Sequence, residues 1–278
     1  MTSPEAGRPQ TQQDARLTEP DDLVRLALEA AAAAGQLLLD RQAGIRQAAT
    51  KSSLTDPVTE ADRAAERLVV GTIRTARPAD AVFAEEGTRL AGTSGLRWVI
   101  DPLDGTVNYL YRRPGWAVSI AVEDAAGALA GAVVDPLHEE AFHAVRGHGA
   151  YLNGQRLRVT DPVPSGTALL GTGFSYTPDA RRRQARLMAG LLPLVRDIRR
   201  TGTCAGDLCA LAAGRMDAFL EDELSPWDWA AGALIAREAG AVVTPLRPDT
   251  TNPGLLAAGP ALHAELSGLV HDITSEDP

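Results

Sequence analysis

Apolar residues recur at helical spacing near the start of the chain. In residues 21–42, DDLVRLALEAAAAAGQLLLDRQ, they fall on one helix face, and acidic residues stand at the start, where the helix dipole favours negative charge. A second helix is predicted from Thr59, a residue type that caps helix N-termini, to about Arg77, and Pro78 ends it. The intervening polar segment KSSLTDPVTEAD, which begins at Lys51, has no apolar periodicity and predicts a loop.

Strand patterns follow these two helices. The apolar runs in AVFAEEG and RWVID are typical of buried strands. From Trp116 to Val159 the pattern changes to short strands with turn signals between them, and Asn153-Gly154 is a strong hairpin signal. The strands predicted in this block are AVSIAVED, ALAGAVVD, EAFHAVR and RLRVT.

Strands and helices alternate in the remainder of the chain. The strands predicted there are ALLGTGF, DAFLE, AVVTPL and LLAAG. The helices are predicted at about 178–195, 204–213, 227–239 and 260–272. Alternating elements with an antiparallel block in the middle predict an α/β protein of stacked helix and sheet layers.

Length and composition limit the domain organisation. The chain has 278 residues, of which 45% are apolar, enough for a sizeable core. Residues 1–20 are polar and are expected to form a disordered tail. We expect one domain over 21–278, with two intimate halves at about 21–160 and 161–278.

Charge and cysteine content exclude several classes of protein. The net charge of −9 argues against a nucleic-acid binder, which needs a basic face, although metal ions would still allow a phosphorylated substrate to bind. No apolar run approaches the ~18 residues that span a membrane, and the N-terminus lacks a signal-peptide core, so a cytoplasmic protein without membrane contact is expected. Two cysteines are too few for a disulfide framework and are expected to be buried helix residues.

Carboxylates stand where apolar strand-like runs end. Glu85 and Glu86 follow AVFA, Asp101 and Asp104 follow WVI, and Asp228 lies in SPWDWAAG. Any one of these acids would suit an ordinary loop or helix cap, but strand ends gather along one edge of an open α/β sheet, where sites usually form. Oxygen ligands without histidine or cysteine favour a hard cation such as Mg²⁺ or Mn²⁺.

Gly105-Thr106 directly follows this acidic stretch. If a helical turn begins there, its free N–H groups can hold a phosphate beside the metal-bearing aspartates. No G-x-S-x-G nucleophile motif is present, and Gly171-Thr172-Gly173 lacks the following lysine of a phosphate loop. The pattern therefore favours hydrolysis by metal-activated water.

The motifs E-E-G and W-V-I-D-P-L-D-G-T-V-N-Y, followed by W-D-W-A-A-G and preceded by K-S-S-x-x-D-P-V-T-x-x-D, resemble the inositol monophosphatase family. The resemblance runs over essentially the whole ordered chain. It implies a five-layer α-β-α-β-α sandwich, usually a homodimer, and a lithium-sensitive phosphatase that uses two to three Mg²⁺ ions on a small phosphorylated polyol.

The resemblance also implies roles for individual residues. Glu85, Asp101 and the Leu103 carbonyl would hold the first ion, and Asp101, Asp104 and Asp228 the second. Glu85 would also serve a weaker third ion.

In the same pattern Thr106 acts with Glu85 on the attacking water. Lys51 is a further catalytic candidate, because the family counterpart of its loop is a mobile flap beside the third metal; an ordinary linker is the alternative. The expected substrate contacts are Gly105, Thr106, Thr203, Cys204, Glu221 and Asp228.

Several substrates stay open at this point. Inositol 1-phosphate is favoured, and histidinol phosphate, fructose 1,6-bisphosphate and 3′-phosphoadenosine 5′-phosphate are alternatives, as is a non-catalytic regulatory protein that retains the fold. A bisphosphatase should carry an added basic cluster. The only arginine triplet, Arg181-Arg182-Arg183, is expected on a solvated helix face.

Overall fold

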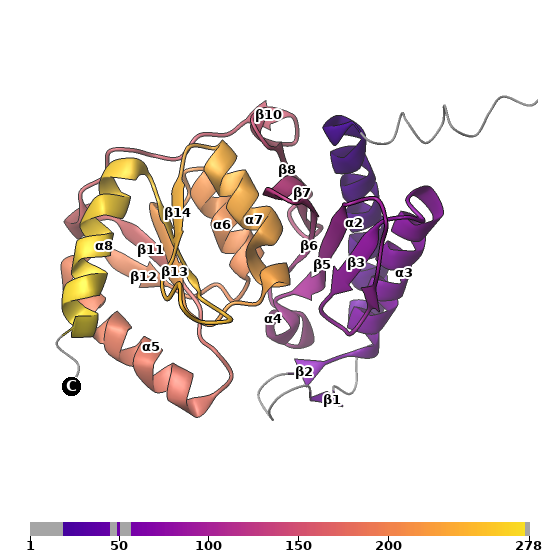
Figure 1. The fold of residues 1–278 in the computed structure, drawn as a ribbon. Helices are drawn as coiled ribbons and strands as arrows, with labels where there is room; N and C mark the ends of the chain where they lie inside the picture. Colours follow the sequence, from indigo (N-terminus) through magenta and orange to yellow (C-terminus); the bar gives the residue numbers. More distant parts are fainter. Residues whose placement is uncertain (1–18, 45–48, 51–56, 276–278) are drawn as a thin grey trace, which may run out of the picture.

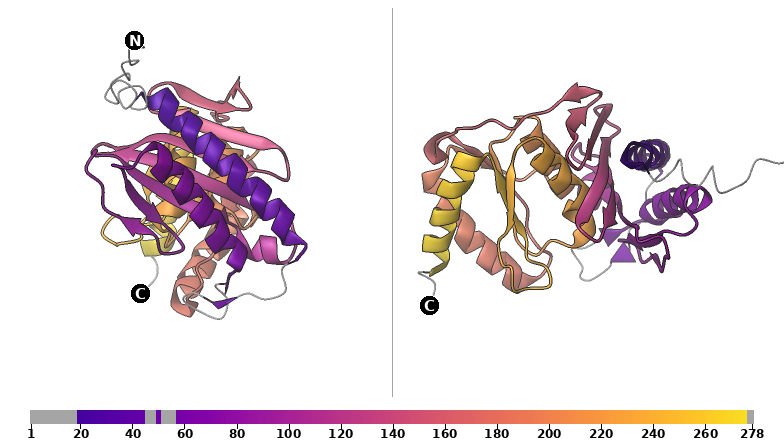
Figure 2. Two further views of the ribbon diagram at one scale, coloured as in Figure 1. Left: turned by 90° about the vertical axis from the view of Figure 1, so that its right-hand side faces the viewer. Right: turned by 45° about the horizontal axis from the view of Figure 1, so that its top comes forward.

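The structure is a computed structural model that describes residues 19–44, 49–50 and 57–275. Its helices and strands form five stacked layers in the order helix, sheet, helix, sheet, helix (Figure 1, Figure 2). The α-β-α-β-α sandwich expected from the sequence is therefore confirmed. Within the described residues, none of the helices combines the length and the apolar content that crossing a bilayer requires.

Two helices lie side by side in the first layer, α2 (Pro20–Gln42) and α3 (Glu60–Ala76). Helix α2 buries a row of alanines and leucines, and α3 begins at a capping box in which Thr59 and Asp62 satisfy each other's backbone N–H groups. Strands β1 (Ala49–Thr50) and β2 (Pro57–Val58) form a separate antiparallel pair before α3.

The second layer is an eight-stranded sheet of order β10-β9-β8-β7-β6-β5-β3-β4. Only β3 and β5 pair in parallel, so both strands end at the same edge and deliver their C-terminal carboxylates together. The strands are β3 (Ala81–Ala84), β4 (Arg89–Leu90), β5 (Arg97–Asp104), β6 (Ala117–Asp124), β7 (Gly127–Asp135), β8 (Glu140–Val145), β9 (Gly149–Leu152) and β10 (Gln155–Arg156).

The other three layers complete the sandwich. Helices α6 (Cys204–Ala212) and α7 (Pro226–Glu238) lie between the two sheets, and α5 (Pro178–Leu191) and α8 (Pro260–Ser275) cover the far face of the second sheet. That sheet has the order β12-β11-β13-β15-β14. Its strands are β11 (Leu169–Thr172), β12 (Asp197–Arg199), β13 (Ala218–Glu221), β14 (Val242–Pro245) and β15 (Leu255–Ala258). The remaining short elements are α4 (Thr106–Leu110), η2 (Ser165–Thr167) and η3 (Leu192–Leu194).

Three apolar cores lie between the five layers, and the second of them surrounds the middle helices α6 and α7. On β6, Val118, Ile120 and Val122 pack against the first helix layer, whereas Ala117 and Ala121 pack toward α6 and α7. The alternation of side chains along a strand explains why a strand covered on both faces shows a continuous apolar run. The third core lies between the five-stranded sheet and helices α5 and α8.

Most predicted elements are confirmed, with three corrections. The strand predicted at RLRVT is wrong beyond Arg156, because the chain leaves the sheet and the Val159 N–H donates to the Ala239 carbonyl after α7 at 3.0 Å. The strand β9 was not predicted, although Asn153 and Gly154 form the expected turn with positive φ. The helix predicted to reach 195 ends at Leu191, because Pro193 cannot donate a helical hydrogen bond.

A buried ion pair fixes the two parallel strands that carry acids. Arg77 donates to both carboxylate oxygens of Asp80, at 2.8 and 2.9 Å, just before β3. The Trp98 indole on β5 donates to the same carboxylate at 2.8 Å. Asp80 and Trp98 have no solvent exposure, so this contact joins α3, β3 and β5 at the end opposite their acids.

Replacing Asp80→Ala should lower the free energy of unfolding by about 3–5 kcal/mol, because it breaks a buried pair and removes the acceptor of Trp98. Urea unfolding followed by tryptophan fluorescence measures the change. Glu29→Ala is the matched control, since it breaks the exposed Arg25–Glu29 pair and should change stability by only about 0–1 kcal/mol. Equal losses in the two variants would contradict the account.

Candidate active site

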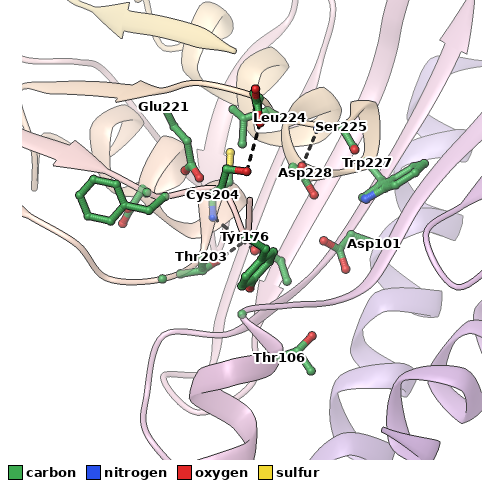
Figure 3. Close-up of a pocket in the computed structure, with 18 of the residues that line it drawn as sticks. Asp101, Thr106, Tyr176, Thr203, Cys204, Glu221, Leu224, Ser225, Trp227 and Asp228 are labelled. Carbon is green, nitrogen blue, oxygen red and sulfur yellow. Dashed lines mark hydrogen bonds between the residues drawn. The ribbon is translucent and has the colours of Figure 1, made fainter. Parts of the chain in front are cut away.

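A pocket of about 440 Å³ lies where the strand ends of both sheets meet the N-termini of α4, α6 and α7 (Figure 3). It brings together every described residue to which a catalytic, metal-binding or substrate-binding role was predicted. These residues are Glu85, Asp101, Leu103, Asp104, Gly105, Thr106, Thr203, Cys204, Glu221 and Asp228. Lys51 and its segment 51–56 lie outside the described residues. The roles themselves remain predictions at this point.

The end of β5 turns two aspartates into the pocket. Pro102 lies between Asp101 and Asp104, and the register with β6 shifts between these two acids. The Leu103 N–H donates to Asp101 Oδ1 at 3.0 Å, which holds the irregular stretch in place. Both aspartates are buried, so the strand end places two carboxylates with little solvent exposure in the pocket wall.

Asp104 connects the two halves of the sandwich. Its Oδ2 accepts hydrogen bonds from Thr203 Oγ1 at 2.5 Å and from the Ala205 N–H at 2.7 Å, and the Cys204 N–H approaches Oδ1 at 3.3 Å. These amides belong to the first turn of α6, where the helix dipole favours a negative charge. Burial still raises the pKa of Asp104 to about 6.

Asp228 and Glu85 add two more carboxylates from other elements. Asp228 is the third residue of α7 and accepts from the Ser225 N–H at 2.6 Å in a capping box, so the helix start fixes its position. Figure 3 shows the carboxyl groups of Asp101 and Asp228 facing the same space. Burial, followed by the charges of Glu85 and Asp104, raises the pKa values of both aspartates well above their usual range.

The donor set suits a hard divalent cation. Four carboxylates gathered in one pocket repel one another, and oxygen ligands of this kind are those that Mg²⁺ binds in proteins. Among the described residues, however, no group of three or more His, Cys, Asp or Glu side chains could enclose a metal ion as it stands. Each of the three aspartates accepts a hydrogen bond from a neighbouring backbone N–H group, which orients its side chain. To hold an ion together, the three side chains would have to turn toward one another.

Thr106 begins α4 and contacts an acid that the sequence analysis left out of the site. Its Oγ1 lies 3.1 Å from both Asp62 Oδ1 and the Leu103 carbonyl. Asp62 is buried and also caps α3 through Thr59. Asp62 lies three residues after the predicted N-cap Thr59, but only the fold brings that helix start to Thr106, 44 residues later.

Gly105 allows the tight turn into α4. Its φ is +94°, and a Cβ there would lie 2.6 Å from the Gly115 carbonyl and 3.0 Å from Trp116 Cα. No other residue fits this position without moving backbone atoms. The predicted helical turn at Gly105-Thr106 is therefore confirmed.

The far end of the pocket lies against the second sheet. Glu221 ends β13, and its carboxylate would be only 2.1 Å from a Cβ placed on Gly173, so that glycine makes room for it. This explains the second glycine of Gly171-Thr172-Gly173, whereas a Cβ on the first would lie 2.7 Å from Met216 Sδ. Burial, followed by the charges of Asp104 and Asp207, raises the pKa of Glu221 to about 8.

Cys204 is a poor nucleophile in this environment. It lies in the pocket wall, but it is buried, and burial together with the charge of Glu221 raises the pKa of its thiol well above the usual range. Because the thiolate is the reactive form, Cys204 does not suit the role of a catalytic nucleophile.

The arginine triplet is exposed at Arg181 and Arg182, as expected, whereas Arg183 is partly buried. Arg183 forms an ion pair with Glu223, and Arg181 Nε donates to the Ser175 carbonyl at 2.6 Å. Arg182 pairs only locally, with Asp179, and is largely exposed.

Comparisons with known proteins agree with the motifs. A model described as "Inositol monophosphatase family" matches residues 19–275. Inositol-1-monophosphatase SuhB of Mycobacterium tuberculosis is 41% identical over 94% of this chain and 97% of its own length. A protein named Nus factor SuhB from Pseudomonas aeruginosa is 42% identical over 80% of this chain and 84% of its own length.

Solved structures show the same fold. Extragenic suppressor protein suhB from Bartonella henselae has a TM-score of 0.83 and 34% identity over 88% of this chain and 97% of its own. The structure of Mycobacterium tuberculosis SuhB has a TM-score of 0.81 and 40% identity over 92% of this chain and 98% of its own. The resemblance read from the sequence motifs is confirmed.

A test of the electrostatics at this site uses Asp207, a buried acid in the pocket wall. Burial raises its pKa from the usual 3.8 to about 7; the nearby charge of Asp104 also raises it, while the Thr201 hydroxyl and Arg200 oppose the shift. The unfolded chain loses this proton near pH 4 and the folded chain near pH 7. The folded state therefore holds the extra proton in this interval, and the free energy of unfolding falls as the pH rises through it.

Asp207→Asn stays neutral and keeps an oxygen for Thr201. Urea unfolding with a chelator present measures the effect. The free energy of unfolding of the variant should be higher than that of the wild type by on the order of 2–4 kcal/mol at pH 8, and the two values should be equal at pH 4. The exposed control Asp197→Asn should show no such gain. Parallel pH profiles for wild type and Asp207→Asn would disprove the buried-acid interpretation.

Proposed function

The chain belongs to the inositol monophosphatase family, and from this premise we propose that it is a Mg²⁺-dependent phosphomonoesterase that hydrolyses inositol 1-phosphate to inositol and phosphate. One observation carries the proposal. A single pocket joins the carboxylates of Glu85, Asp101, Asp104 and Asp228 to the Thr106–Asp62 contact and to a helix N-terminus.

The carboxylates and the Leu103 carbonyl would hold the cation, as the donor chemistry of the site allows. When bound, Mg²⁺ neutralises the acids, attracts phosphate oxygens and favours ionisation of water. The family expectation of two to three ions, with Mn²⁺ as a substitute, belongs to the same proposal.

The chain's own groups would orient the reactants. A water molecule beside Thr106 can donate to its Oγ1, while that hydroxyl donates to Asp62, so a proton can pass from water to the carboxylate. Glu85 lies in the same pocket and would help to orient this water. The N–H groups of Gly105 and Thr106 at the start of α4 would hold the phosphate.

The far end of the pocket favours a substrate with a single phosphate. Glu221, Glu223 and Asp207 line it, and Arg200 is the only basic side chain among the described lining residues. A second phosphate would find no basic side chain beyond Arg200 among these lining residues, which disfavours the two bisphosphate alternatives. Hydroxyl groups can donate to the carboxylates, as inositol requires.

The same acids support histidinol phosphate as the second candidate, since its amine is cationic. The Nus factor name of a relative supports a different role, that of a regulatory binding protein. A homodimer, as in the family pattern, is part of the proposal.

A phosphate-release assay with Mg²⁺ titration separates these possibilities. The panel contains inositol 1-phosphate, histidinol phosphate, fructose 1,6-bisphosphate and 3′-phosphoadenosine 5′-phosphate. We expect Mg²⁺-dependent release with inositol 1-phosphate as the preferred substrate. If the protein prefers another ester, that ester replaces inositol 1-phosphate as the proposed substrate. If it releases phosphate from none of them, the regulatory role is favoured.

Asp101→Asn should reduce this activity by roughly 100-fold or more, because an amide binds Mg²⁺ poorly and several kcal/mol of charge stabilisation are lost. The variant should stay folded in a thermal melt, since it removes one of several repelling buried acids. Asp179→Asn, on the exposed start of α5, serves as the control and should keep full activity. Full activity of Asp101→Asn at saturating Mg²⁺ would rule out the proposed metal ligand.

Glu221→Ala should reduce turnover of inositol 1-phosphate about tenfold more than turnover of an aryl phosphate without hydroxyls, because a hydrogen bond between a substrate hydroxyl and the Glu221 carboxyl group is lost. Steady-state kinetics on both esters measures the difference. If both substrates lose equally, Glu221 supports the fold instead of the substrate.

A further inference from the structure

The two residues after Glu221, Asp222 and Glu223, have an unusual backbone and unusual partners. Glu223 adopts a φ of +62°, a left-handed conformation that normally favours glycine. It nevertheless lines the active-site pocket. A side chain kept at a strained position beside a pocket calls for a specific purpose.

The Glu223 carboxylate is held by groups from three other segments. Arg183 on α5 donates to its Oε1, the Ser175 hydroxyl donates to its Oε2 at 3.1 Å, and Arg247 after β14 approaches Oε1 at 3.5 Å. Ser175 and Glu223 line the pocket, whereas neither arginine does. The guanidinium groups therefore approach the carboxylate from behind the pocket wall.

Asp222 completes this arrangement. Its Oδ1 accepts from Arg247 Nε at 2.7 Å and from the Glu223 N–H at 2.9 Å. Gln184 on α5 donates to the Asp222 carbonyl at 3.0 Å and accepts from the Ser175 N–H at 2.9 Å. Two arginines pair with two acids, so the network can hold the Glu223 side chain in one orientation at the pocket surface.

We propose that Glu223 is a specificity-determining residue that accepts a hydrogen bond from a hydroxyl of the leaving group, and that Arg183, Arg247 and Asp222 hold it in position. The inference rests on the proposed phosphomonoesterase function. A carboxylate has about four acceptor positions, and the contacts with Arg183, Arg247 and Ser175 leave capacity for a substrate donor. With Glu221 two residues earlier, the pocket presents two carboxylates to a polyol, which needs several acceptors at once.

The test compares inositol 1-phosphate with 4-nitrophenyl phosphate, an ester whose leaving group has no further hydroxyl. Glu223→Gly removes the carboxylate and suits the left-handed backbone, so the protein should fold. Its kcat/KM should fall about tenfold more for the inositol ester than for the aryl ester, mainly through KM. Glu223→Gln keeps one acceptor oxygen and should lose less.

Arg183→Leu tests the support of Glu223. It should change kcat/KM for the two esters in the same direction as Glu223→Gly. Arg182→Leu, one residue earlier and largely exposed, should change kcat/KM for neither ester. Thermal melts of all variants report folding independently of activity.

The possible failures can be told apart. If the wild-type protein turns over both esters and Glu223→Gly loses equally on both, or loses nothing, Glu223 only shapes the loop and the inference is overturned. If the wild-type protein releases phosphate from neither ester, the proposed function fails first and the inference fails with it.

Discussion

Repulsion among buried carboxylates is the constraint on which the rest of this structure depends. Asp101, Asp104 and Asp228 come from β5 and α7 and lie in one pocket with Glu85, where burial and mutual charge raise the pKa values of all three aspartates. Backbone N–H groups from the β5 irregularity and from the starts of α6 and α7 offset part of this repulsion. A divalent cation bound in the pocket would offset the remaining repulsion.

The layered fold explains why these acids can be held together. Three apolar cores fix the sheets and helices, so strand ends and helix N-termini meet at one place with little freedom to move apart. The contact of Thr203, Cys204 and Ala205 with Asp104 joins a helix of the middle layer to a strand of the large sheet. The walls of the pocket therefore come from both sheets and from the helices between them.

Local patterns in the sequence predicted most elements, because capping residues, turns and apolar periodicity act over a few positions. The acids at strand ends were found for the same reason. Asp62 as the partner of Thr106 and Arg183 as the partner of Glu223 were missed, since these contacts join residues 44 and 40 positions apart. The strand predicted at RLRVT was wrong beyond Arg156 because the Val159 N–H donates to the Ala239 carbonyl after α7 and not to a neighbouring strand. The need for glycine at position 173 comes from the Glu221 carboxylate, which lies against it and is 48 positions away in the sequence.

Anomalous diffraction from crystals soaked in Mn²⁺ tests the central claim most directly, namely that the repelling carboxylates form a cation site. Manganese substitutes for Mg²⁺ at oxygen sites and its position can be located without assuming ligands. The account predicts anomalous peaks in the pocket at coordination distance from Asp101, Asp104, Asp228 and Glu85, whose side chains turn toward the ion. Absence of a peak there at millimolar Mn²⁺, with the acids still facing their backbone partners, would contradict it.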